Sequence, residues 1–347
     1  RRISNELRWH LIERDAGRGF ALLPRPSPGD GIFDIEGDPF WEPAQGLHFL
    51  FGLLLRDGSD WRYQPIWAHD RVGERAMFEA FVDLVHARLV ADPGMHVYHY
   101  GTYENAAIKQ LMGSYATRED AVDELLRRNV FINLHTVVRQ GLRAGVDKYS
   151  LKEVEALAKF GRQADVRKGI DAVLNYEKWR KSNDAAMLAS IADYNAEDCR
   201  ATLALRDWLV ENHPADKSWA AIVVQKDGKK EDDGERNALR QRLIEGEEVG
   251  SVRWLAGELL EYHRREARPA WWWYFKRRDL MTDEELLDDA EAISGLAPTG
   301  EAVPDRSSII YTLRFPPQQH KLAAGKTVVD PVTKKSPGTI VAIDEED

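Results

Sequence analysis

Apolar residues gather into short runs, separated by polar turns, along the first third of the chain. Residues 31–36, 47–55 and 61–67 form three such runs, and the turn-like segment RDGSD separates the second from the third. Short apolar runs bounded by turn residues predict β-strands, and the last two are predicted to form a hairpin. Residues 72–90 then repeat apolar positions at helical spacing, and residues 95–98 have the pattern of a short buried strand.

The remainder is predicted to be mostly helical until the C-terminal region. Residues 184–210 form one long helical pattern, and three short alternating runs near the C-terminus predict a small antiparallel β module. An N-terminal helix is expected over residues 3–15, before a proline-rich linker. We therefore divide the chain into an N-terminal helix and linker (1–29), a main domain (30–213), a helical appendage (214–300) and the β module (301–347).

Two acidic residues interrupt the first apolar run, in the segment GIFDIEGDPFW. If this run is a strand, Asp34 and Glu36 leave the same face, because side chains alternate between the two faces of a sheet. Their neighbours Phe33 and Ile35 are apolar, which indicates a central strand. Acids on a buried strand are costly unless they are paired or bind a metal. We favour metal ligation over the alternative of a strand with one polar face.

A second acidic position lies in the long helical pattern, in the segment YNAEDCRAT. Tyr194 and Asp198 are four residues apart and therefore share a helix face. Asp193 and Glu197 leave the register open, but only Asp198 lies one turn after the tyrosine. Tyr194 would orient an attacking water, and its alternative role is that of a half-buried core tyrosine.

Glu104, after the segment HYGT, is the fourth carboxylate candidate; it is either a metal ligand or a first-turn helix acid. Converging carboxylates repel each other unless cations lie between them, and Mg²⁺ and Mn²⁺ prefer such oxygen ligands. Two of these ions held close together serve in-line displacement at a phosphodiester. We expect two Mg²⁺ or Mn²⁺ ions, and a catalytic set made of Asp34, Glu36, Glu104, Tyr194 and Asp198, whose four carboxylates bind the metal.

The order of these motifs resembles a known family. D-x-E, then an aromatic–carboxylate pair after HYGT, then Y-x-x-x-D, over residues 31–212, is similar to the three motifs of DEDD-type 3′–5′ exonucleases, and the tyrosine marks the DEDDy subgroup. More narrowly, FDIEGDPF, YHYGTYE, YSLKEVE and YNAEDCRAT resemble the exonuclease-like domain of bacterial proteins that join a RecB-like nuclease region to a helicase.

The resemblance implies an α/β fold with an RNase H-like mixed sheet flanked by helices, followed here by the helical appendage and the β module. It also implies 3′→5′ hydrolysis of DNA, with single-stranded 3′ ends as the expected substrate. The expected partners are helicase and RecB-like nuclease regions of the same full-length chain. Because the sequence starts at Arg1 and stops after IDEED, we interpret it as a piece of that longer protein.

Two departures from the family motifs keep a second hypothesis open. The second motif ends in Glu104 where the family usually has Asp, and the segment FINLHTVVRQGL has Asn133 where relatives usually have Asp. An amide carries no charge and is a poorer ligand for a hard cation. The alternative is therefore a catalytically silent module that binds nucleic acid or serves as a scaffold. A phosphohydrolase with an Asp nucleophile is a third, weaker hypothesis, because Glu36 stands where its second Asp belongs.

Composition restricts the setting of the protein. The formal net charge of −10 argues against indiscriminate binding of polyanions. Residues 139–168 are locally basic, and we interpret them as a solvated helix surface. The single cysteine, Cys199, excludes an internal disulfide and a cysteine-cluster zinc site, and it fits a reducing cytoplasm. Since no apolar run reaches membrane-spanning length, we expect a cytoplasmic protein without a membrane partner.

Overall fold

The computed structural model of the 347-residue chain consists of two compact units, residues 1–230 and 231–347, which are described one at a time. The described residues are 8–12, 17–41, 46–162, 169–221, 234–248, 250–263, 266, 274, 277–278, 281, 283–287, 289–306, 308–333 and 335–344.

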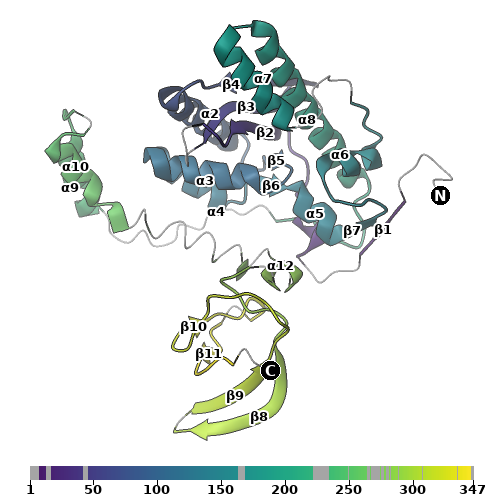
Figure 1. Ribbon diagram of the computed structural model, residues 1–347, viewed down its shortest axis with the longest axis vertical. Helices are drawn as coiled ribbons and strands as arrows, with labels where there is room; N and C mark the ends of the chain where they lie inside the picture. Colours follow the sequence, from purple (N-terminus) through teal and green to yellow (C-terminus); the bar gives the residue numbers. More distant parts are fainter. Residues whose placement is uncertain are drawn as a thin grey trace. The chain divides into compact units, whose positions relative to one another are not determined.

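The first unit is built on a five-stranded mixed sheet with the strand order β4-β3-β2-β5-β6 (Figure 1). Its strands are β2 (Gly31–Asp38), β3 (Leu47–Asp57), β4 (Asp60–Trp67), β5 (Val97–His99) and β6 (Phe131–Asn133). β2, β3 and β4 are antiparallel, whereas β5 and β6 run parallel to β2. This arrangement confirms the predicted mixed sheet. The short strand predicted over residues 95–98 is β5, which begins two residues later, at Val97.

Helices cover both faces of this sheet (Figure 1). One face carries α2 (Arg71–Ala91), α3 (Tyr103–Tyr115) and α4 (Glu119–Arg127), and the other carries α7 (Gly169–Ser182) and α8 (Ala185–Glu211). α2 and α8 confirm the two long helical patterns of the sequence. Asp184 caps α8 by accepting a hydrogen bond from the Ala186 amide, which fixes where this helix begins.

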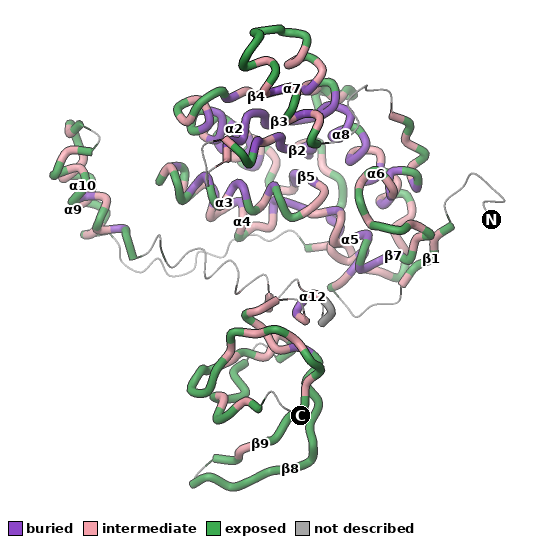
Figure 2. The backbone as a smooth tube through the Cα atoms, viewed as in Figure 1, coloured by how far each residue is buried: buried purple, intermediate pink, exposed green. Residues whose placement is uncertain are grey.

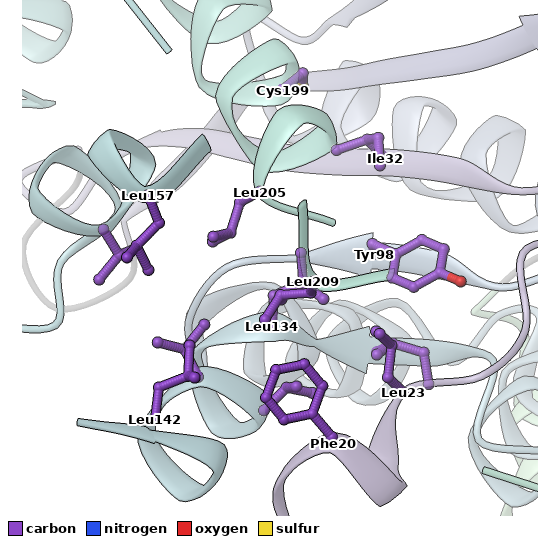
Figure 3. Close-up of a cluster of buried hydrophobic side chains, with 14 of the residues drawn as sticks. Phe20, Leu23, Ile32, Tyr98, Leu134, Leu142, Leu157, Cys199, Leu205 and Leu209 are labelled. Carbon is purple, nitrogen blue, oxygen red and sulfur yellow. The ribbon is translucent and has the colours of Figure 1, made fainter. Parts of the chain in front are cut away.

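Shorter elements lie at one end of the sheet. They are the 3₁₀ turn η1 (Gly19–Leu22), α5 (Leu134–Gly141), β7 (Leu142–Ala144), α6 (Leu151–Val154) and the 3₁₀ turn η2 (Glu155–Ala158). Together with the second half of α8 they enclose an apolar cluster that includes Ile32, Leu134 and Leu205 (Figure 3). Cys199, fully buried, belongs to the same cluster. This packing holds the second half of α8 against the sheet.

A buried ion pair fixes α8 at the start of β2. The Arg206 guanidinium lies 3.0 Å from a carboxylate oxygen of Asp30, and both side chains are almost completely buried. Asp30 also accepts hydrogen bonds from the backbone amides of Ser27 and His96. A buried charge is tolerated when it is paired and hydrogen-bonded in this way, and removing one partner is strongly destabilising. The pair therefore sets the position of α8 relative to the strand that carries Asp34 and Glu36.

The predicted N-terminal helix is wrong where the structure describes it. Residues Trp9–Leu11 form strand β1, which pairs antiparallel with β7. Trp9 packs edge-on against Trp208 of α8, with ring centroids 4.9 Å apart. This tertiary contact and the pairing with β7 outweigh the helical pattern, since propensity is a weak constraint on so short a segment. Residues 3–7 and 13–15 of the predicted helix lie outside the described residues.

The second unit contains helices followed by two small antiparallel ladders. Among its described residues, the helices are α9 (Gly234–Ile244), α10 (Val252–Leu259) and α12 (Asp283–Leu287). The ladders pair β8 (Ala297–Asp305) with β9 (Ser308–Arg314) and β10 (Thr327–Val328) with β11 (Gly338–Thr339). Every residue of β8 is exposed, in contrast to β2 and β3 (Figure 2). The predicted domain boundaries stay predictions. Within the described part of the chain, every helix is too short or too polar to cross a bilayer.

Candidate metal centre

Strand β2 supplies two carboxylates to the face that α8 covers. Phe33 points to the opposite face, where its ring stacks on Phe81 of α2 with centroids 4.2 Å apart. Asp34 and Glu36 leave the same face, as the sequence predicts, and this is the face that α8 covers. Asp34 lies opposite Gly52 of β3, and the register shifts directly after Glu36. β-bulges of this kind are common beside active sites, where they redirect a side chain.

The third carboxylate comes from α8. Asp34, Glu36 and Asp198 each offer an oxygen atom, and the three atoms lie within 4.8 Å of one another. Glu36 and Asp198 are each only 8% exposed. Residues separated by more than 160 positions along the chain thus form one compact acidic group, as the metal-site hypothesis requires.

Electrostatics make this group unfavourable without a positive partner. Burial, followed by the negative charges of Asp198, Glu36 and Glu104, raises the pKa of Asp34 well above its ordinary value. Burial and the charge of Asp198 raise the pKa of Glu36 to about 8. Such carboxylates take up protons or bind cations, and an all-oxygen donor set suits a hard divalent cation. The residues present therefore fit Mg²⁺ or Mn²⁺.

Arg162 forms a cationic edge to the acidic group. Its Nη1 atom lies 2.6 Å from Oδ1 of Asp198, and its Nη2 atom lies 2.7 Å from Oε2 of Glu155 on η2. The Arg162 side chain is only 17% exposed. Our interpretation of residues 139–168 as a solvated surface is therefore wrong for this residue, while Arg167 and Lys168 lie outside the described residues.

Tyr194 lies one helical turn before Asp198 and is 5% exposed. Burial and the charge of Asp198 raise the pKa of its hydroxyl, so the hydroxyl keeps its proton and can donate it in a hydrogen bond. Lys152 Nζ lies 3.2 Å from the hydroxyl oxygen and 4.9 Å from the ring centroid. Lys152 is the second residue of α6, so the first turn of this helix brings a positive charge to the site.

An open cleft of about 590 Å³ leads to these residues. Asp34, Tyr194, Asp198 and Lys152 lie in its wall. The rest of the wall is rich in rings and hydroxyls, namely Tyr100, Thr102, His135, Tyr149 and Ser150. This cleft therefore combines carboxylates, which suit a hard cation, with a positively charged side chain and flat rings.

Glu104 lies beside the acidic group but is not one of its three members. It is in the first turn of α3, 4% exposed, and its Oε2 atom lies 3.1 Å from Nδ1 of the fully buried His99. Its charge nevertheless contributes to the raised pKa of both Asp34 and Glu36. The role of Glu104 as a metal ligand stays a prediction.

Asn133 has a structural role that its sequence context does not indicate. Its side-chain Oδ1 accepts hydrogen bonds from the amides of His135 and Gly101, at 3.0 and 3.1 Å. The side chain thereby caps α5 and connects it to the turn before α3.

Asn195 is a site residue that our sequence reasoning missed. Its Nδ2 atom donates a hydrogen bond to Oδ2 of Asp34 at 2.6 Å. The only signal in the sequence is its position next to Tyr194, which does not show that the amide reaches a strand 161 residues away.

Comparison with known proteins agrees with this geometry. A family model described as the RNase_H superfamily matches residues 32–210, which is more than half of the chain. The matched segment includes the five-stranded sheet from β2 onward, α8 and all three clustered carboxylates. Searches of curated proteins and of solved structures find no match. From the extent of the family match and the fold that accompanies it, the chain belongs to the RNase H superfamily.

Proposed function

We propose that this protein is a metal-dependent 3′→5′ exonuclease that hydrolyses phosphodiester bonds of single-stranded DNA with two Mg²⁺ or Mn²⁺ ions. The observation that carries the proposal is the convergence of Asp34, Glu36 and Asp198 within 4.8 Å. Asp34 and Asp198 lie in the wall of an open cleft, together with Tyr194, and this position supports the proposal further. The polarity and the DNA preference rest on the resemblance of the motifs to DEDDy exonucleases.

In this proposal Asp34, Glu36 and Asp198 hold the ions, and Glu104 completes the ligand set. When bound, the ions lower the pKa of the attacking water and stabilise the leaving 3′ oxygen. Tyr194, whose hydroxyl stays protonated, orients the water. Lys152 adds positive charge where the scissile phosphate enters.

The cleft rings Tyr100, His135 and Tyr149 suit a flexible single strand, because stacking needs bases that are not paired. We also propose that the chain acts in the cytoplasm, together with helicase and RecB-like nuclease regions of the same longer protein.

The direct test is degradation of a 5′-labelled single-stranded oligonucleotide in the presence of Mn²⁺. We expect a ladder of shortened products, and no cleavage of the same sequence as a closed circle, which offers no 3′ end. Asp198→Ala is expected to lose at least about 100-fold in rate, because it removes a ligand that stabilises transition-state charge. Asp193→Ala is the matched control, since Asp193 is an exposed acid on the same helix.

A second candidate function is the catalytically silent module. The observation that favours it is the ion pair between Arg162 and Asp198, which gives this carboxylate a positive partner without a metal. A silent module is expected to retard the labelled oligonucleotide in a gel with and without Asp198→Ala, to leave it intact, and to show no thermal stabilisation by Mn²⁺. An active site is stabilised by the ions it binds, by mass action.

A further inference from the structure

The amide of Asn195 lies between the two carboxylates of β2. Its Nδ2 atom is 2.6 Å from Oδ2 of Asp34 and 3.4 Å from Oε1 of Glu36. Asn195 is fully buried, and its nitrogen donates to these two carboxylates within the described part of the chain. One neutral donor group therefore connects both ligands that the strand supplies.

A second contact fixes the orientation of this amide. The Tyr63 hydroxyl on β4 donates a hydrogen bond of 2.8 Å to Oδ1 of Asn195. Burial raises the pKa of Tyr63, so its hydroxyl keeps the proton that it donates. With Oδ1 directed toward Tyr63, the NH₂ group must face the carboxylates.

The sheet is shaped to admit this side chain. Gly52 of β3 lies opposite Asp34 in the register of the sheet, and a Cβ atom at position 52 would lie 1.6 Å from Oδ1 of Asn195. Any larger residue would occupy the place of the amide. Because Gly52 has no side chain, the Asn195 side chain of α8 has room to reach the carboxylates.

We propose that Asn195 is a positioning residue of the metal centre: its amide holds Asp34 and Glu36 in place for cation binding, and Tyr63 fixes the direction of the amide. The inference rests on the proposed metal-dependent function and adds two residues to it. A neutral amide suits this task because it restrains both carboxylates without cancelling their charge, as a lysine or arginine would. Hydrogen-bonding partners of metal ligands typically contribute 10- to 100-fold in metal affinity or activity.

Calorimetric titration of the full chain with Mn²⁺ tests the proposal. Asn195→Ala is expected to raise the Kd for Mn²⁺ by about 10-fold or more, and Tyr63→Phe by about threefold, because it loosens the amide without removing it. The double variant is expected to match Asn195→Ala alone, because the Tyr63 hydroxyl acts only through the amide. The control is Leu205→Val, a core change in the same helix, which is expected to lower the Tm and leave the Kd unchanged.

The outcomes separate this inference from the proposed function. If wild-type protein binds no Mn²⁺, the metal-dependent function fails and the inference fails with it. If wild-type protein binds Mn²⁺ and Asn195→Ala binds it equally well, only the positioning role is overturned. Additive losses in the double variant also overturn it, because they would show that Tyr63 acts independently. Should Asn195→Ala not fold, Tyr63→Phe carries the test, and an unchanged Kd there rejects the proposal.

Discussion

The two faces of strand β2 differ in chemistry: one packs apolar rings, and the other carries carboxylates. On one face, Phe33 stacks on Phe81 and meets Phe51 edge-on, so the contact is apolar and closely packed. On the other face, the partly buried Asp34 and the buried Glu36 lie beside Asp198, where their charges oppose folding. From this comparison we infer that the aromatic packing on one face offsets the repulsion among the carboxylates on the other.

The largest expected effect on this comparison is the pH dependence of the free energy of unfolding of the metal-free protein. Burial raises the pKa of Glu36 from 4.5 to about 8, so the folded state binds a proton that the unfolded state releases above pH 4.5. The free energy of unfolding should therefore fall as pH rises from about 4.5 to about 8, by up to about 1.4 kcal/mol for each pH unit. Urea unfolding in the presence of EDTA, at several pH values, measures this fall in the free energy of unfolding.

The control for this experiment is Glu36→Gln. It removes the titrating group, and its stability should depend less on pH across the same window. His96, whose pKa burial lowers to about 4, acts in the opposite direction below pH 6.5, so the difference between wild type and variant is the quantity to compare. The groups that face Glu36 are Asp34, Glu104, Lys152, Asn195 and Asp198. Parallel stability curves would contradict the prediction. Saturating Mn²⁺ should abolish the fall in wild-type stability between about pH 4.5 and about pH 8, because a bound cation keeps Glu36 ionised.

Truncation of the apolar face comes next in size. Phe33→Ala should lower the free energy of unfolding by about 3–5 kcal/mol, because it removes a ring that is 1% exposed and leaves a cavity. Chemical denaturation at pH 7 measures the change, with Phe40→Ala as the control, since Phe40 is 76% exposed. A loss equal to that of the control would show that this face does not hold the strand.

Removal of the Tyr194 hydroxyl should affect catalysis and leave stability nearly unchanged. Tyr194→Phe is expected to lower kcat by about 100-fold, because a positioned group that takes part in proton transfer or water orientation contributes about this much. Mn²⁺ affinity should stay close to that of wild type. Tyr262→Phe, on a half-exposed tyrosine, is the control for exonuclease assays. An unchanged kcat would assign Tyr194 to the core alone.

The smallest expected effect concerns Arg162, which competes with a cation for Asp198. Arg162→Gln should tighten Mn²⁺ binding by about threefold, in line with the modest energies of single ion pairs. Arg180→Gln removes an exposed arginine that pairs with Glu177, and it should leave the Kd unchanged. Weaker Mn²⁺ binding by Arg162→Gln would show that the arginine supports the site instead of competing for it.

Local patterns were sufficient for the parts of the site that lie within one element. The period of a strand places Asp34 and Glu36 on one face, and the period of a helix places Tyr194 and Asp198 on another. The three antiparallel strands, α2 and α8 follow from the same reasoning. Such periods are set by backbone geometry, so they survive any tertiary context that keeps the element intact.

The contacts between distant elements could not be predicted from the sequence. Asn195 reaches Asp34 because Gly52 leaves an opening, and the pairing of β2 with β3 is needed to see that these positions meet. Likewise, Trp9 lies in a strand because β1 pairs with β7 and the Trp9 ring packs against Trp208. These outcomes depend on the register of the sheet and on side-chain packing, which a single sequence does not reveal.

The buried thiol of Cys199 can be used to follow the opening of the packing beneath α8, next to the acidic group. It is the single cysteine of the chain, it is fully buried, and its thiol faces the backbone oxygen of Gly52 beneath α8. A thiol reagent can therefore react only after the packing between α8 and the sheet opens around this thiol. The rate of labelling measures how often the helix that carries Tyr194, Asn195 and Asp198 opens, and it does so in the wild-type protein without an added probe.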